Sequence, residues 1–387
     1  MKIIIIILAF IMLSGCKTKV VEVDSIPFNI NTNIEVYTNT YLYDLLSNTF
    51  DIEIISDNYK IDTDIVRKKE YEILYRKDKK NYSYKFNVDV IDTEYPLVFS
   101  GTNRTILKGY DKDLCNLITY GDNYTGNLKC EISGYYDVNK IGTYKLVYNI
   151  SDSSNNTTSA NVTLNVVDKI SNSINYNNLT TPISEALELY KNDNTEIGID
   201  VSEWQGDIDF NKVKDAGVTF VIIRIGVQTN DFEPKLDNKY LDNIKNAKDA
   251  GLKVGVYLYS ITDNKESAKN QALWVLDKLN NEKLELGIAF DWENWKYWNE
   301  YKISFHDINE IANTFMDTIN ENGYSTMLYG SKFYLEKIWK TNYPIWLAHY
   351  IDGKSDYNND YIIWQQCSNG IIDGIDGFVD IDIMYTK

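Results

Sequence analysis

The sequence GIAFDWENW, residues 287–295, places two carboxylates two positions apart at the end of an apolar run. The run from Leu286 to Phe290 does not alternate between apolar and polar residues, which is typical of a strand buried on both faces in a parallel sheet. Residues i and i+2 of a strand project from the same face, so we expect Asp291 and Glu293 to meet one ligand. Two acids held close together have pKa values that are pushed apart, which leaves one as a general acid and the other ionised, as in a glycosidase.

Around this stretch, strands alternate with helices from residue 195 to residue 387. The expected strands are EIGIDV, TFVIIRIG, KVGVYLYS, LGIAFDWE, TMLYG, PIWLAHY, YIIWQQ and FVDIDIM. The expected helices cover residues 210–216, 237–250, 265–279, 304–321 and 332–339, and Ser304 with Asp307 reads as the start of the fourth. This alternation predicts a small α/β domain, a TIM-like (β/α) barrel. An open doubly wound sheet is the alternative, but no Gly-rich phosphate loop follows the first strand.

The active site of such a barrel lies at the carboxyl ends of its strands. Acids and aromatic residues predominate at the predicted ends: Asp200, Arg224, Tyr257, Tyr259, Asp291, Glu293, Tyr329, Trp346, Tyr350, Trp364, Gln365, Asp380 and Asp382. Aromatic rings stack on sugar faces and carboxylates act on glycosidic oxygens, so the set favours a carbohydrate site over a phosphate or metal site. In a chain with 31 tyrosines, core packing is the alternative for any single ring, and the set as a whole carries the inference.

Length and composition limit the other possibilities. A chain of 387 residues with 44% hydrophobic residues can bury a core and hold two or three domains. The formal charge of −17, from 39 basic and 56 acidic residues, has no basic stripe and argues against a nucleic-acid partner. Four cysteines and two histidines are too few and too scattered for a zinc site, so we expect no metal and no cofactor.

The first residues predict export. A short apolar run, residues 3–13, precedes Ser14, Gly15 and Cys16, and it is too short to span a membrane as a helix. The sequence LSGC resembles the lipobox of bacterial lipoproteins, which implies that residues 1–15 are a signal peptide and that Cys16 is lipidated. The alternative is an ordinary signal peptide with an incidental cysteine. In the first reading the mature chain is anchored to a membrane without spanning it.

Residues 24–168 read as strands and contain an internal repeat. The segment around Tyr71 and Tyr75 aligns with the segment around Tyr144 and Tyr148. Two β-sandwich modules, residues 16–93 and 94–168, fit this pattern, and the second resembles the immunoglobulin-like spacers of bacterial surface proteins. No acid cluster with calcium-loop spacing is present in the sequence of this region. Cys115 and Cys130 lie in one module of an exported chain, and the sequence leaves open whether they form a disulfide. A polar linker, residues 169–194, follows and includes a short helix at 184–191.

Residues 195–387 resemble glycoside hydrolase family 25, the Chalaropsis-type lysozymes, in the order of their motifs. These motifs are IGIDVSEWQGDIDF, AGLKVGVYLYS, AFDWE, MLYG, IWLAHY, WQQ and GIDGFVDID. The resemblance implies N-acetylmuramidase activity on peptidoglycan and a flattened β/α barrel. It implies that Glu293 is the proton donor and that Asp291 is a nucleophile or orients the acetamido group of the substrate. Further acids of the pocket would be Asp200 and Asp380, and the sugar subsites would be lined by Tyr257, Tyr259 and Trp364.

Two departures from the family pattern stand out. Tyr257-Leu258-Tyr259 replaces a frequent Y-H-Y, and Asp380-Ile381-Asp382 replaces a frequent Asp-x-Asn. The extra acid at Asp382 is expected to raise neighbouring pKa values and to move the pH optimum upward. The spacing of Asp291 and Glu293 leaves a retaining, an inverting and a substrate-assisted mechanism open.

These observations predict an exported, lipid-anchored, monomeric lysozyme-type hydrolase that acts on peptidoglycan, with two β-sandwich spacers before its barrel. The main alternative is a non-catalytic wall-binding lipoprotein that uses a glycosidase-derived barrel. The presence of Asp200, Asp291, Glu293 and Asp380 favours the enzyme, since decay of a catalytic site usually removes one acid. A chitinase-like hydrolase is the third reading, and the WQG and WQQ motifs argue against it.

Overall fold

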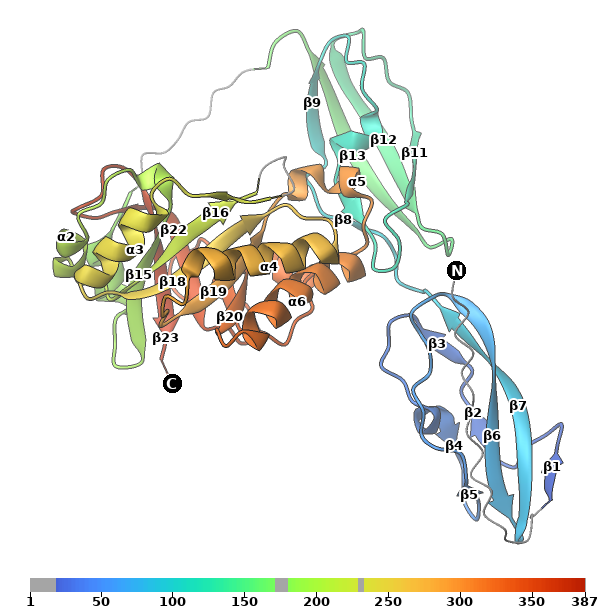
Figure 1. Ribbon diagram of the computed structural model, residues 1–387. Coiled ribbons are helices and arrows are strands. Elements are labelled where there is room, and N and C mark those ends of the chain that lie inside the picture. Colours follow the sequence, from blue (N-terminus) through green and yellow to red (C-terminus); the bar gives the residue numbers. More distant parts are fainter. Residues whose placement is uncertain (1–18, 171–179, 229–232, 387) are drawn as a thin grey trace. The chain divides into compact units, whose positions relative to one another are not determined.

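The computed structural model describes residues 19–170, 180–228 and 233–386 (Figure 1). The chain divides into two compact units, Met1–Glu94 and Tyr95–Lys387. The expected signal peptide and the lipidation site Cys16 lie outside the described residues. None of the helices in the described ranges is long and apolar enough to cross a membrane.

The first unit is built on one long antiparallel hairpin, β6 (Arg67–Lys77) and β7 (Lys80–Ile91). Asp78 and Lys79 connect the two strands with φ values of 49° and 62°, the left-handed pair that favours a two-residue hairpin turn. Alternate residues of both strands, among them Ile73, Tyr75 and Val88, are buried. The remaining elements are β1 (Val20–Glu22), β2 (Asn29–Ile30), β3 (Asn33–Glu35), η1 (Leu42–Leu45), β4 (Leu46–Ser47) and β5 (Glu53–Ile54).

The second unit begins with a module that repeats this arrangement. Its hairpin consists of β12 (Gly142–Ser151) and β13 (Thr157–Val167), and β9 (Asn103–Leu107) pairs parallel to β13 as β3 pairs parallel to β7. Tyr75 and Tyr148, aligned in the sequence repeat, are both buried. Each copy of the repeat therefore forms the same hairpin. The module also contains β8 (Leu97–Val98), η2 (Leu114–Leu117), β10 (Tyr120–Gly121) and β11 (Lys129–Ser133).

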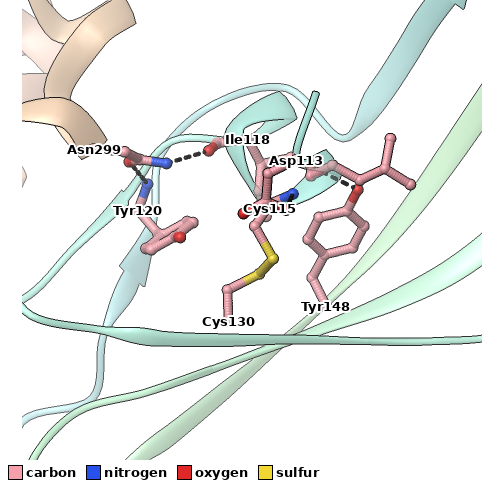
Figure 2. Close-up of a disulfide and its surroundings, with 8 residues drawn as sticks. Asp113, Cys115, Ile118, Tyr120, Cys130, Tyr148 and Asn299 are labelled. Atoms are coloured by element: carbon pink, nitrogen blue, oxygen red, sulfur yellow. Dashed lines mark hydrogen bonds between the residues drawn. A yellow bond between two sulfur atoms is a disulfide. The ribbon is translucent and has the colours of Figure 1, made fainter. Parts of the chain in front are cut away.

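Cys115 in η2 and Cys130 in β11 are joined by a disulfide, with their Cα atoms 6.1 Å apart (Figure 2). The phenol of Tyr148 donates to the Leu114 carbonyl oxygen beside it at 3.0 Å. Both contacts tie the irregular segment of η2 to the sheet of the module, where it covers the buried face of β12 and β13.

Residues 195–228 and 233–386 form a closed barrel of eight strands, which confirms the predicted number and order. The strands pair in chain order and close from the last onto the first: β15 (Thr195–Val201), β16 (Phe220–Val227), β18 (Lys253–Ser260), β19 (Gly287–Trp292), β20 (Thr326–Ser331), β21 (Ile345–Ala348), β22 (Ile363–Ile371) and β23 (Val379–Tyr385).

The barrel is mixed rather than all parallel. The first seven strands are parallel to one another, whereas β23 runs antiparallel to both β22 and β15. Only the loop 372–378, without a helix, connects β22 to β23. Such a short connection makes a hairpin, because a parallel neighbour would need a crossover of a dozen or more residues.

Helices cover the outside of the barrel close to their predicted positions: α2 (Phe210–Asp215), α3 (Tyr240–Asp249), α4 (Lys265–Leu279), α6 (Phe305–Glu321) and α7 (Lys332–Lys337). Helices α4 and α6 lie side by side (Figure 1). Ser304 caps α6 in a reciprocal capping box with Asp307, as its sequence predicts.

The predicted linker, residues 169–194, is shorter in the structure because its second half belongs to the barrel. The short strand β14 (Thr181–Pro182) pairs with β22, and α1 (Ile183–Tyr190) buries Ile183 and Ala186 in the core between strands and helices. A second short addition, β17 (Lys235–Leu236), pairs with β16.

Candidate active site

A pocket of about 190 Å³ opens at the rim of the barrel where the predicted acids and aromatic residues meet. The residues that line it come from seven of the eight strands or directly follow them: Asp200, Tyr257, Asp291, Glu293, Tyr329, Trp346, Tyr350, Gln365 and Asp380. Every one of these residues is among those predicted from the strand ends. Parallel strands bring their carboxyl ends to one edge of a barrel, which is why residues so far apart in sequence converge.

Asp380 reaches this rim by a different route from the other acids. Because β23 is antiparallel, its beginning rather than its end lies at the rim, and Asp380 pairs directly opposite Asp200 on β15. Asp382 follows two residues deeper and is completely buried. The sequence predicted both acids at the carboxyl end of a strand. The prediction of the rim is correct for Asp380, but the predicted direction of the strand is wrong.

Gln365 connects three walls of the pocket. Its amide nitrogen donates to Asp200 Oδ2 at 2.7 Å, and its amide oxygen accepts from the phenols of Tyr329 at 2.8 Å and Tyr350 at 2.7 Å. Both hydrogen-bonding groups of the buried amide are therefore used, and its orientation is determined by its neighbours. This network holds the two phenols and one carboxylate in place before any ligand binds.

A second buried pair lies beneath the pocket floor. The indole Nε1 of Trp346 donates to Asp382 Oδ1 at 2.8 Å, while Asp382 Oδ2 has no donor among the described residues and interacts with the Asp200 carboxyl. Burial, together with the charges of Asp380 and Asp382, raises the pKa of Asp200 well above its ordinary value. Burial also raises the pKa of Asp382 to about 8. A proton held between Asp200 and Asp382 relieves the repulsion of two buried carboxylates.

The acid pair at the end of β19 is divided between interior and solvent. Asp291 is buried, and burial followed by the charge of Glu293 raises its pKa well above the ordinary value, while Arg224 acts in the opposite direction. Glu293 is exposed by its surface area, but its carboxyl is surrounded by the other residues that line the pocket. This partial burial, with the charge of Asp380, raises the pKa of Glu293 to about 7. One acid of the pair is thus kept protonated near neutral pH.

Arg224 supplies the positive charge that acts on Asp291, and it is already paired. Its guanidinium donates to Asp237 Oδ2 at 2.7 Å and to Glu203 Oε1 at 3.1 Å. Asp237 also accepts the backbone N–H of Glu203 at 3.0 Å, so the loop after β15 and the segment before α3 are tied together. The sequence pointed to Arg224 at a strand end but contained no signal for its partners, because they lie 13 and 21 residues away.

A wider groove of about 480 Å³ continues from the pocket on the outer side of Glu293. It shares Glu293, Tyr329 and Tyr350 with the pocket, and its further lining residues end or follow β20 and β21: Ser331, Lys332, Phe333, Glu336, Ala348 and His349. Glu293 therefore stands between two spaces, one with acidic walls and one that is open and partly apolar. Ser331 and Ala348 end their strands, His349 follows β21, and the other three lie on α7, so none of the six was among the acids and aromatic residues read from the strand ends.

Two residues predicted to line sugar subsites lie elsewhere. Trp364 is buried in the core outside the barrel, where its indole donates to the His349 carbonyl oxygen at 2.8 Å and packs edge-on against Tyr190. Successive residues of a strand point to opposite faces, so Gln365 faces the pocket and Trp364 cannot. Tyr259 does not line the pocket but pairs with Asp291 in the register of β18 and β19. Burial, followed by the charges of Asp291 and Glu293, raises the pKa of Tyr259 to about 12.

An acid contact that the sequence did not suggest lies in the second β module. The buried Asp122 and Asp152 have carboxylate oxygens within 4.8 Å of each other. Asp122 Oδ1 accepts the N–H groups of Tyr124 and Thr125, and Asp152 accepts those of Ser154 and Asn156, so each carboxylate also stabilises the turn that follows it. Residues this far apart carry no common spacing motif.

Comparison with known proteins identifies the family of the barrel. Residues 199–375 match the family described as Glycosyl hydrolases family 25, and this part of the chain is a family 25 domain. The autolytic lysozyme of Clostridium acetobutylicum is 29% identical over 188 residues, which is 48% of this chain and 54% of that protein. The chain thus spans about half the length of this curated relative.

Two solved bacterial proteins are similar to part of the chain. The modular autolysin LytC of Streptococcus pneumoniae, solved in complex with a synthetic peptidoglycan ligand, is 28% identical and covers 62% of this chain and 56% of its own, with a TM-score of 0.45. The bacterial lysozyme of Streptomyces coelicolor is 20% identical and covers 49% of this chain and 92% of its own, with a TM-score of 0.40.

Proposed function

We propose that the chain is a lysozyme-type peptidoglycan hydrolase that cleaves the β-1,4 bond between N-acetylmuramic acid and N-acetylglucosamine. The observation that carries the proposal is the position of Glu293, an acid with a pKa raised to about 7 between an acidic pocket and an open groove. A glycosidic oxygen bound at this boundary would receive the Glu293 proton as its bond to the sugar in the pocket breaks. General acid catalysis of this kind contributes roughly 10²- to 10⁴-fold in rate.

Asp291 is proposed to orient the acetamido group of the sugar in the pocket or to act as a nucleophile. Its Oδ1 is buried without a hydrogen-bond donor among the described residues, so it offers an acceptor to a ligand N–H. A hydrogen bond donated to the Asp291 carboxylate would favour its ionised form. In the coupled pair, this shifts the shared proton towards Glu293, where the reaction requires it.

The remaining acids are proposed to stabilise the positive charge that develops on the sugar ring. Asp200 and Asp380 lie opposite each other on adjacent strands and both face the pocket. Tyr257, Tyr329, Tyr350 and Trp346 supply aromatic walls, and two of the phenols are already oriented by Gln365. An oxocarbenium-like transition state is stabilised by such preorganised negative charge.

The proposal also covers the location of the protein and the role of its N-terminal half. The LSGC sequence supports lipidation at Cys16 and export, with the hydrolase anchored outside the cytoplasm as a monomer. The repeated hairpin with a parallel third strand supports two immunoglobulin-like modules before the barrel. Labelling of the wild-type chain by radioactive palmitate, and its loss in Cys16→Ala, would test the anchor.

The hydrolase proposal is tested with the chain from Lys19 onward and purified peptidoglycan. Soluble reducing ends are measured for the wild type and for Glu293→Gln, and the released fragments are identified by mass spectrometry. We expect muramic acid reducing ends from the wild type and a loss of at least 100-fold in the variant. If neither protein releases sugar and both sediment with the wall, the domain is a non-catalytic wall-binding module.

A further inference from the structure

The second β module contacts the loop that directly follows Glu293. This loop forms two short helical turns, η4 (Trp295–Tyr297) and α5 (Trp298–Tyr301), and reverses at Lys302 with a left-handed φ of 57°. In the module, α5 contacts β10, which pairs with β8, and the label of β8 stands next to α5 in Figure 1. The barrel loop with the proposed proton donor is thus covered by a module that precedes the barrel in sequence.

Backbone hydrogen bonds of the module are completed by the barrel. Figure 2 shows Asn299 reaching from α5, with its side-chain nitrogen donating to the Ile118 carbonyl oxygen at 2.8 Å. Its side-chain oxygen accepts the Tyr120 N–H at 3.2 Å, so this one amide pairs with the module as a neighbouring strand would.

The module in turn completes hydrogen bonds of the barrel. The Phe305 N–H donates to the Asp122 carbonyl oxygen at 2.7 Å, and the His306 N–H donates to that of Asn123 at 3.2 Å. These N–H groups belong to the first turn of α6, where a helix cannot satisfy them itself. The module therefore caps the helix that follows the loop.

Side chains at this contact are packed as in a domain core. Phe99 inserts between four aromatic rings of the barrel at centroid distances of 5.9–6.2 Å: Trp295, Trp298, Phe305 and Tyr334. Two glycines of the module permit the close approach. A Cβ on Gly126 would lie 2.0 Å from the Lys302 carbonyl oxygen, and one on Gly121 would lie 2.5 Å from the Phe305 ring.

The contact leads directly to Glu293. The Trp295 N–H donates to the Glu293 carbonyl oxygen at 2.7 Å, and the Trp295 ring stacks on Tyr334 with a centroid distance of 4.0 Å. Phe99 touches both of these rings. The segment that carries Glu293 is therefore held between the barrel and the module.

We propose that the module at residues 95–168 positions Glu293 for catalysis, with Asn299 and Phe99 as the positioning residues at the contact. The proposal rests on the proposed role of Glu293 as proton donor. If the contact is opened, the loop gains freedom, and the Glu293 carboxyl gains water and leaves its place between pocket and groove. The titratable groups that face Glu293 belong to every surrounding element: Tyr259, Asp291, Tyr329, Tyr334, Tyr350 and Asp380.

Two variants open the contact from opposite sides. Asn299→Ala removes both side-chain hydrogen bonds, and Gly126→Ala inserts a methyl group against the backbone of Lys302. Each has a matched control: Asn270→Ala on the exposed face of α4, and Gly101→Ala in the same module, where a Cβ would meet nothing within 4 Å. All five proteins are compared as the chain from Lys19 onward.

The first readout is the exchange of amide hydrogen for deuterium in peptides covering residues 293–306. We expect faster exchange at Trp295, Phe305 and His306 in both opening variants and unchanged exchange in both controls. The second readout is kcat, KM and the pH profile on soluble peptidoglycan fragments. We expect kcat to fall about tenfold with little change in KM, because a shift of ~1 Å in a catalytic group can cost up to 10²-fold.

The pH profile separates positioning from mere stabilisation. Water that enters around Glu293 lowers its pKa, so the alkaline limb of kcat should move to lower pH by about half a unit or more. The proposal would be overturned if exchange became faster at Phe305 and His306 but not at Trp295, and if kcat and the pH profile stayed as in the wild type. If the wild type has no activity, the hydrolase function fails, and the exchange at Trp295 still decides whether the module holds the loop.

Discussion

The side-chain amide of Gln365 on β22 donates a 2.7 Å hydrogen bond to Asp200 Oδ2 on β15, across the intervening strand β23. The oxygen of the same amide accepts hydrogen bonds from the phenols of Tyr329 and Tyr350. The position of Asp200 therefore depends on a residue that has no charge of its own. Its neighbour Gln366 is also buried but donates to the Ile351 carbonyl oxygen at 2.9 Å. Two adjacent glutamines thus serve different purposes, one at the site and one in the scaffold.

Gln365→Leu should lower kcat/KM by about tenfold or more, because Asp200, Tyr329 and Tyr350 each lose a hydrogen bond that orients them. Gln366→Leu is the matched control, since it removes a buried amide of the same size that does not line the pocket. We expect it to lower the melting temperature while activity stays near wild type. Equal losses of activity in the two variants would contradict the role of Gln365.

The pH dependence of activity should show an alkaline limb near pH 7, since Glu293 must be protonated to act as an acid and its pKa is raised to about 7. The charge of Asp380 is one cause of this raised value, after burial. Asp380→Asn should therefore move the limb to lower pH, whatever its effect on the maximal rate. The measurement is kcat/KM from pH 4 to 9, and a limb that stays in place would show that Asp380 does not act on Glu293.

Stability should fall as the pH rises towards 8 because of Asp382. Its pKa is about 8 in the folded chain against an ordinary 3.8, so between these values the folded state binds more protons than the unfolded state. The free energy of unfolding then decreases with pH, and Asp382→Asn removes this contribution. Calorimetry should show a drop in melting temperature between pH 5 and pH 8 that is smaller in the variant by about 2 °C or more. Asp352→Asn, at an exposed acid, should keep the wild-type drop.

Trp364→Phe should lower stability rather than sugar binding, because the Trp364 side chain lies in the outer core and loses its hydrogen bond to His349. A buried change of this kind costs about 1–3 kcal/mol. Tyr257→Phe, on a residue that lines the pocket, should instead raise KM or lower kcat with a smaller change in melting temperature. A raised KM in Trp364→Phe at unchanged stability would contradict this and indicate that Trp364 contacts the sugar.

Removal of the disulfide should destabilise the second β module. Cys115 and Cys130 are 15 residues apart, and closing a loop of this length contributes about 3 kcal/mol in the chain-entropy account. The double variant Cys115→Ser/Cys130→Ser should unfold at lower denaturant concentration, followed by tryptophan fluorescence, since the module contacts Trp295 and Trp298 through Phe99. Unchanged unfolding would mean that the β12 and β13 hairpin alone holds η2 in place.

The elements of the barrel and most of its site could be predicted from the sequence. Buried strands such as β19 begin with continuous apolar runs, here residues 287–290, and helix starts such as Ser304 carry local capping signals. Because parallel strands end at one rim, reading the strand ends collected nine residues that line one pocket. Local chemistry was sufficient for this part, since each prediction needed only a few neighbouring residues.

Only the tertiary structure decided the direction of β23, the face to which strand side chains point, and the contacts between residues far apart in sequence. The alternating sequence of β23 does not tell the direction of the strand, and the hairpin with β22 made it antiparallel. Trp364 and Gln365 could not be assigned to a face from sequence, because both faces of a barrel strand are buried. The contact between Asn299 and residues 118–120 joins positions about 180 apart in sequence, and such a contact depends on how two folded surfaces fit rather than on any local pattern.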